Sequence, residues 1–282
     1  MEIKQISVIG GGTMGNGIAH VFALKGFRVN LVEQTSELTE KAVKTISGNL
    51  DRQLKKNVIT EQDKSSAINR ISPVVGIENT PKDSDLIIEA VYEDKLAKIK
   101  IFNQLQNIIK PESIFATNTS SISITELSSA SRADNFIGMH FMNPVPVMKL
   151  VEIIRGYSTS DDTYNTIKEL TLKIDKTPVE VFDYPGFVAN RILMPMINEA
   201  VFALMEGVAS AEDIDTVMKL GMNHPMGPLT LADFIGLDVC LAIMEVLYNG
   251  YNDSKYRPCP LLKKMVAAKK LGRKTGEGFF KY

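Results

Sequence analysis

The chain opens on Ile3-Lys4-Gln5-Ile6-Ser7-Val8-Ile9-Gly10-Gly11-Gly12-Thr13-Met14-Gly15, and this stretch decides the fold. Its first half predicts a strand, and Gly10, Gly12 and Gly15 then match the dinucleotide-binding fingerprint G-x-G-x-x-G. We expect the first glycine to permit a tight turn and the second to let the backbone approach a pyrophosphate. The third lets the next helix pack closely on the sheet, and that helix presents N–H groups and a positive dipole end to phosphate.

A carboxylate at the end of the second expected strand favours NAD over NADP. Residues 28–32, Arg-Val-Asn-Leu-Val, form that strand, and Glu33 follows it eighteen residues after Gly15. A carboxylate at this point accepts hydrogen bonds from the adenosine ribose hydroxyls, whereas it repels a 2′-phosphate. The sequence therefore predicts an NAD site. The alternative is a glycine turn in a βαβ unit that binds no ligand.

Composition places the chain among ordinary globular proteins. Its 282 residues are 44% hydrophobic and 23% charged, with a net charge of −1, and the length suits about two domains of ~100–200 residues. No basic stripe indicates nucleic acid, and no polybasic segment or long apolar run indicates a membrane. The first strand begins directly after the N-terminus with no targeting segment before it, so we expect a cytoplasmic protein. Cys240 and Cys259 lack Cys or His neighbours at metal-ligand spacing, which predicts unpaired thiols and no metal site.

Strand and helix patterns alternate through the first two thirds of the chain. Further strands are expected over residues 71–75, 85–91, 113–117, 136–141, 147–154 and 177–182, and helices over 36–57 (with Ser36 as N-cap), 95–109 and 162–173. This alternation predicts an α/β fold with a Rossmann-type doubly wound sheet over residues 1–184. Beyond it, helices are expected over 187–205, 211–220, 229–248 and 260–270, so residues 185–282 form an all-α domain.

Of the three histidines, His140 is the candidate for proton transfer. It ends the strand 136–140, at the carboxyl edge where open α/β sheets bind ligands, and imidazole titrates near neutrality. Glu152 follows on the next strand after a proline-containing turn, and a carboxylate beside an imidazole orients it. The alternative is a structural His–Glu pair. His20 lies among apolar residues of the first helix and is expected to be packed there, and His224 is expected to brace a loop.

Two polar segments extend this candidate site. Asn118-Thr119-Ser120-Ser121 follows a strand at the same edge, where a hydroxyl reaches a substrate oxygen, although such a run also forms turns and helix caps. Asn190 stands in an otherwise apolar helix at the start of the second domain, and we expect it to face a cleft between the domains.

Across nearly its whole length the chain resembles the L-3-hydroxyacyl-CoA dehydrogenases, and among them the free-standing bacterial 3-hydroxybutyryl-CoA dehydrogenases. The shared segments occur in order: residues 8–15, 88–90, 118–121, 140–152, 185–191, 224–229 and 272–279. The run His-Phe-Met-Asn-Pro-Val-Pro-Val-Met-Lys-Leu-Val-Glu from His140 to Glu152 is the most specific of them.

The resemblance implies a role for each matching position. His140 is the general acid/base, Glu152 its orienting partner, and Ser120 and Asn190 hold the reacting oxygen of the substrate. NAD-binding positions are Gly10, Gly12, Thr13, Met14, Gly15, Glu33, Glu93, Lys98, Asn143 and Lys274. Lys56 matches a position that contacts CoA, with a solvated helix charge as the alternative, whereas Asn49 replaces a CoA-contacting Ser of some relatives.

The implied reaction is the reversible NAD-dependent oxidation of an (S)-3-hydroxyacyl-CoA to the 3-oxoacyl-CoA, with a short acyl chain. The implied partners are the acyl-CoA substrate and a second copy of the chain in a homodimer, held through the helical domain. Two alternatives stay open. One is a β-hydroxyacid dehydrogenase acting on a free acid, which typically uses a lysine where this chain has Asn190. The other is a non-enzymatic NAD-binding structural protein, which the presence of both His140 and Glu152 disfavours.

Overall fold

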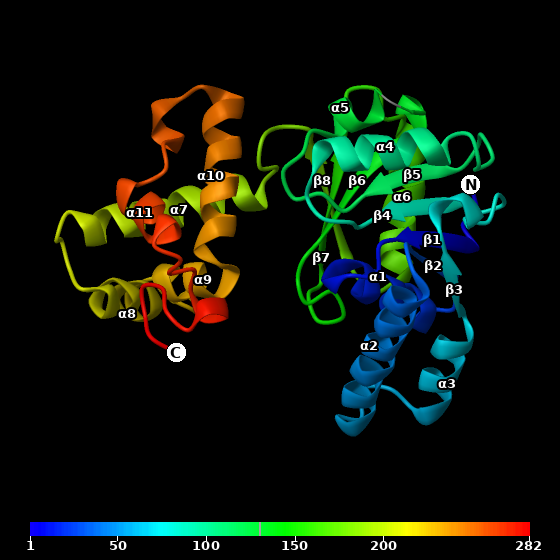
Figure 1. Ribbon diagram of the computed structural model, residues 1–282, viewed down its shortest axis with the longest axis horizontal. Coiled ribbons are helices and arrows are strands. Elements are labelled where there is room, and N and C mark those ends of the chain that lie inside the picture. Colours follow the sequence, from blue (N-terminus) through cyan, green and yellow to red (C-terminus); the bar gives the residue numbers. More distant parts are fainter. Residues whose placement is uncertain (130) are drawn as a thin grey trace. The chain divides into compact units, whose positions relative to one another are not determined.

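The computed structural model describes residues 1–129 and 131–282, and the chain divides into two compact units, Met1–Asp183 and Tyr184–Tyr282 (Figure 1). The first unit holds the sheet, and the second holds helices. Among the described residues, no helix combines the length and apolar character needed to cross a bilayer.

The first unit is built on a sheet of eight strands in the described residues, in the order β3-β2-β1-β4-β5-β6-β7-β8. Their bounds are β1 Gln5–Ile9, β2 Arg28–Glu33, β3 Ile71–Val75, β4 Leu86–Glu89, β5 Ile114–Thr117, β6 Phe136–Phe141, β7 Leu150–Arg155 and β8 Thr177–Phe182. Neighbouring strands pair in parallel, apart from β6 and β7, which pair antiparallel. The predicted doubly wound α/β fold is confirmed.

Helices connect these strands: α1 Thr13–Leu24, α2 Ser36–Lys55, α3 Glu61–Asn69, α4 Lys95–Leu105, α5 Ile124–Ser128 and α6 Asp161–Lys173. The structure differs from the sequence analysis at two points here. The N-cap of α2 is Thr35, not Ser36, because the Thr35 side chain accepts a hydrogen bond from Leu38 N. Helix α3 was not predicted, although Thr60 and Asp63 form a capping box at its start.

Apolar side chains fill both faces of the sheet. Alternate residues of a strand point to opposite faces, and β6 illustrates this. Phe141 meets Phe22 of α1 edge-on at a ring-centroid distance of 6.4 Å, whereas Phe136 packs on Phe102 of α4 at 4.7 Å. His140 is the penultimate residue of this strand, in which every residue is buried, and its side chain points to the same face as Phe136.

The second unit is helical, as predicted: α7 Ala189–Met205, α8 Ala211–Gly221, α9 Pro228–Ile235, α10 Leu237–Tyr251 and α11 Pro260–Ala267. The single helix expected over residues 229–248 was wrong. Gly236 has φ 104°, which L-residues with a side chain rarely adopt, and it separates α9 from α10. Cys240 and Cys259 are free thiols buried in this unit, and burial raises the pKa of Cys240 to about 12.

Candidate active site

Two of the three glycines after β1 have the structural roles that the fingerprint predicts. Gly10 has φ 97°, and its N–H donates to Val32 O at 2.9 Å, which turns the chain sharply off the strand. A Cβ on Gly15 would lie 1.7 Å from Gly10 O, so only glycine lets α1 pack this closely on the turn. A Cβ on Gly12 would meet nothing within 4 Å. Contacts inside the chain therefore do not explain why this position is a glycine.

Glu33 lies against the same turn. Its Oε1 accepts from Gly11 N at 2.6 Å, and its Oε2 accepts from Gln34 N at 3.1 Å. The carboxylate therefore lies at the carboxyl end of β2, beside the N-terminus of α1, where no side chain caps the helix. The open space at Gly12, the uncapped helix and the adjacent carboxylate together fit the pyrophosphate and ribose of a dinucleotide.

His140 and Glu152 form a close buried pair. They are directly opposed in the antiparallel register of β6 and β7, so their side chains share one face of the sheet. His140 Nδ1 lies 2.7 Å from Glu152 Oε2, and the two side chains are 10% and 2% exposed. A carboxylate that accepts from Nδ1 fixes the imidazole's orientation and directs its chemistry to Nε2.

The polar segment after β5 is tied to a carboxylate. Glu93 Oε1 accepts from Ser120 N at 2.9 Å and from Ser120 Oγ at 3.2 Å, and the hydroxyl of Thr119 also donates to it. Burial raises the pKa of Glu93, but Lys98 and these donors outweigh burial and lower it. Lys98 is fully buried, and its Nζ lies 2.7 Å from Glu89 Oε1 and 3.4 Å from Glu93 Oε2.

Asn118 joins this segment to the strand that carries His140. Its side-chain oxygen accepts from Phe141 N at 3.0 Å, and its own N–H donates to Glu89 O at 2.8 Å. The ends of β4, β5 and β6 are thus linked by hydrogen bonds, and Ser120 and His140 belong to one connected edge of the sheet.

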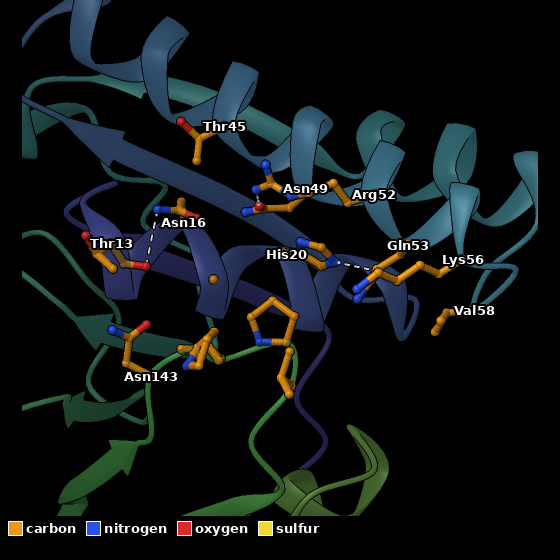
Figure 2. A pocket seen from close by; sticks show the side chains of 15 residues that line it. Thr13, Asn16, His20, Thr45, Asn49, Arg52, Gln53, Lys56, Val58 and Asn143 are labelled. Atoms are coloured by element: carbon orange, nitrogen blue, oxygen red, sulfur yellow. Dashed lines mark hydrogen bonds between the residues drawn. The ribbon is translucent and has the colours of Figure 1, made fainter. Parts of the chain in front are cut away.

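A pocket of about 660 Å³ lies beside this edge, between α1, α2 and residues 143–147 (Figure 2). Helix α1 contributes Thr13, Asn16 and His20, helix α2 contributes Asn49 and Arg52, and Lys56 directly follows α2; Asn143 lies on the facing loop. His20 is buried, as expected, with its Nε2 3.1 Å from Gln53 Oε1.

Met14 follows Thr13 in the first turn of α1, and two further predicted positions lie in the second unit. Asn190 stands in the first turn of α7 and is buried. Lys274 lies in a short 3₁₀ turn, Arg273–Thr275, and forms an ion pair with Asp238 of α10.

Two residues of the site escaped sequence reasoning. Arg52 lines the same pocket as Lys56, four residues earlier in the chain, and this spacing was the available signal. Glu89 was visible as part of a shared segment, but its pairing with Lys98 was not, because the two lie on different elements.

A Rossmann-type sheet with a dinucleotide turn and an imidazole–carboxylate pair at its carboxyl edge defines the class of NAD-linked dehydrogenases. Comparison with known proteins narrows the class. Residues 5–184 match the family model "3-hydroxyacyl-CoA dehydrogenase, NAD binding domain", and residues 186–282 match "3-hydroxyacyl-CoA dehydrogenase, C-terminal domain". The chain belongs to the 3-hydroxyacyl-CoA dehydrogenase family.

Individual relatives agree with this assignment. The chain is 54% identical to a 3-hydroxybutyryl-CoA dehydrogenase of Bradyrhizobium diazoefficiens, over 99% of this chain and 96% of that protein. It is 41% identical to the mitochondrial hydroxyacyl-coenzyme A dehydrogenase of Rattus norvegicus, over 99% and 91%. The crystal structure of (S)-3-hydroxybutyryl-CoA dehydrogenase from Ralstonia eutropha superposes with a TM-score of 0.97 at 51% identity, covering 100% and 99% of the two chains.

Proposed function

We propose that this protein catalyses the reversible oxidation of (S)-3-hydroxybutyryl-CoA by NAD⁺ to acetoacetyl-CoA, NADH and a proton. The observation that carries the proposal is the 2.7 Å contact between His140 Nδ1 and Glu152 Oε2 at the carboxyl edge of the sheet. The printed names of the bacterial relatives supply the acyl chain.

His140 performs the proton transfer in this proposal. Bound NAD⁺ supplies a hydride acceptor at the nicotinamide ring. The imidazole Nε2 takes the proton of the 3-hydroxyl group as the C3–H bond breaks, and Glu152 stabilises the imidazolium that results. In the reverse direction the same nitrogen returns the proton to the 3-oxo oxygen.

Other residues bind and orient in the same proposal. Ser120 and Asn190 hold the reacting oxygen, and Asn143 lies beside the nicotinamide. The adenine half of NAD rests on the glycine turn with Thr13, Met14 and Glu33, while Glu93, Lys98 and Lys274 complete the cofactor site.

The pocket between α1 and α2 suits the CoA moiety. Arg52 and Lys56 bring two cations to a pocket whose other walls include amides and the apolar side chains of Val145 and Val147. Phosphates of CoA favour such cations, and a pantetheine arm favours the apolar wall. We therefore assign Lys56 and Arg52 to the phosphates.

The test of the function compares substrates and cofactors in one assay. Acetoacetyl-CoA and acetoacetate are each offered with NADH and with NADPH, and absorbance at the reduced nicotinamide is followed. We expect reduction of acetoacetyl-CoA with NADH. Turnover of acetoacetate alone would indicate a β-hydroxyacid dehydrogenase, and no turnover with any pair would indicate an NAD-binding structural protein.

The CoA assignment has its own test. Arg52→Ala and Lys56→Ala should each raise the KM for acetoacetyl-CoA by about ten-fold, because each charge-assisted hydrogen bond contributes about 1.5–3 kcal/mol. Neither change should affect S-acetoacetylpantetheine, which lacks the phosphates. Lys44→Ala, at an exposed position of the same helix outside the pocket, is the matched control. An equal loss with both substrates would contradict the assignment.

We also propose that the protein forms a homodimer through its helical unit. Large apolar side chains are exposed there on α7, α8 and α9, including Ile192, Leu220 and Phe234. Light scattering of the purified protein should give twice the mass of the chain, and a monomer mass would contradict the proposal. The cytoplasmic location stays a prediction.

A further inference from the structure

Three linked charges, two of them buried, lead from the middle of the sheet to the loop that carries Ser120. Its members are Glu89 at the end of β4, Lys98 on α4 and Glu93 in the loop between them. Glu89 and Lys98 have 0% exposed side chains. Buried charges are costly unless they are paired, so this arrangement calls for an explanation.

Glu89 is held from several sides. Its Oε1 lies 2.7 Å from Lys98 Nζ and accepts from Val91 N at 2.7 Å, and its Oε2 accepts from Thr117 Oγ1 at 2.7 Å. These contacts tie the carboxylate to β5 and to the start of the loop after β4. Glu89 is therefore fixed by the sheet itself.

Lys98 connects this fixed carboxylate to Glu93. Its Nζ lies between the two carboxylates, 2.7 Å from Glu89 and 3.4 Å from Glu93. A buried ammonium group needs nearby anions, and without Glu89 it would be drawn to its other carboxylate. Glu89 thus sets where Lys98 lies, and Lys98 sets where Glu93 lies.

Glu93 in turn shapes the segment after β5. One oxygen atom, Oε1, accepts from both the N–H and the Oγ of Ser120, and Ser121 N also donates to it at 3.2 Å. A small movement of Glu93 therefore moves the Ser120 hydroxyl group.

We infer that Glu89 is a positioning residue for the reaction, acting through Lys98 and Glu93 on the hydroxyl of Ser120. The inference rests on the proposed function, in which Ser120 holds the reacting oxygen. Glu89 touches neither the substrate nor the cofactor in this account. It orients a group that does, and misplacement of such a group by about 1 Å costs up to about 100-fold in rate.

The test combines Glu89→Gln with Ser120→Ala in a double-mutant cycle. Gln has nearly the same size as Glu and keeps an acceptor for Thr117 or Val91, but it removes the charge that holds Lys98. For Glu89→Gln we expect kcat with acetoacetyl-CoA to fall by about 10-fold to 100-fold. The KM for acetoacetyl-CoA should stay within about two-fold of the wild type. In the Ser120→Ala background the same change should cost less than about two-fold, because the group it positions is absent.

Asp85→Asn is the matched control. Asp85 also pairs with a lysine, Lys110, at 2.6 Å, but it lies just before β4, at the opposite end of that strand. This change should lower the thermal midpoint while kcat stays at the wild-type value. The control therefore separates a loss of stability from a loss of orientation of the Ser120 hydroxyl group.

A second variant covers the case in which Glu89→Gln folds poorly. Glu89→Gln combined with Lys98→Met removes both buried charges, so neither charge is left buried without its partner. We expect the thermal midpoint to recover while kcat, measured at saturating NADH, stays low, since Glu93 still lacks its partner. Recovery of kcat together with the midpoint would overturn the inference.

The cycle also separates failure of the inference from failure of the proposed function. An equal loss from Glu89→Gln with and without Ser120 would overturn the positioning role alone. If the wild type does not reduce acetoacetyl-CoA, the proposed function fails before the variants are compared.

Discussion

The carboxyl edge of the sheet has two halves that are built by different means. Around β1, β2 and α1, the backbone forms the candidate site. Gly10 has a positive φ, Gly15 packs closely against Gly10, and no side chain caps the start of α1. Around β4 to β7, side chains form it: an imidazole, a serine and several carboxylates linked through a lysine. A backbone site is set by local sequence, whereas a side-chain site depends on which strands become neighbours.

The largest effect should come from the side-chain half. His140→Gln removes the group that we propose exchanges the proton, but it keeps a polar side chain of similar size. We expect kcat to fall by about 10²–10⁴-fold, since general acid–base catalysis contributes that much. Steady-state kinetics with acetoacetyl-CoA and NADH measures the effect.

A matched measurement of NADH affinity should show that this change leaves the glycine turn and its surroundings intact. NADH affinity, followed by fluorescence titration, should stay within about two-fold of the wild type, because His140 is remote from the glycine turn along the sheet order. Near-normal turnover of His140→Gln would refute the role of the imidazole. A parallel loss of NADH affinity would show that the two halves are not separable.

Substitution of Gly15, in the backbone half, should lower stability. Gly15→Ala places a methyl group 1.7 Å from Gly10 O, and neither group can move without shifting the turn or the helix. Overpacking of this kind costs about 3 kcal/mol at the upper end of the usual range. Urea unfolding should therefore show a lower midpoint for this variant.

Gly12→Ala is the internal comparison for that variant. Gly12 has φ −62° and ψ −165°, which alanine also adopts, and its Cβ would meet nothing in the chain. We expect stability to change by about 1 kcal/mol or less. NADH affinity should fall by about ten-fold or more, because the methyl group stands where the pyrophosphate approaches. Equal loss of stability in both variants would contradict the division of work among the glycines.

This contrast explains what the sequence could predict. The glycine turn was predictable from one short motif, and Glu33 from its position at the end of the strand that follows that motif, although the contact between Gly11 and Glu33 spans 22 residues. The pairing of His140 with Glu152 was expected from their neighbouring strands, but only the antiparallel register places them opposite each other. The break at Gly236 was missed because the apolar pattern of residues 229–248 continues through it, and a lone glycine is tolerated in many helices.

The linked charges of Glu89, Lys98 and Glu93 could not be predicted from the sequence. Nothing local links Glu89 to the serine that follows β5, because their connection passes through α4 and a loop. The hydrogen bond between Glu93 and Ser120 joins residues far apart in the chain, so it depends on packing, and the apolar pattern of a strand gives no sign of it.

The smallest expected effect is a pH dependence of stability at Glu93. Its pKa lies below the ordinary value of 4.5, because the charge of Lys98 and the donors of Thr119 and Ser120 outweigh burial. A carboxyl group with a lowered pKa in the fold stabilises the fold when ionised. This contribution is present at pH values above 4.5 and is lost as the pH falls through the lower, folded-state pKa.

The thermal midpoint of the wild type should exceed that of Glu93→Gln by a constant margin from pH 7 to about 5, and the margin should shrink below that range. Since the side chain is 36% exposed, solvent screens the interaction and the margin is modest. A margin that persists unchanged to pH 3 would mean that the charge of Glu93 does not hold the serine segment, and the side-chain half would then depend on hydrogen bonds alone.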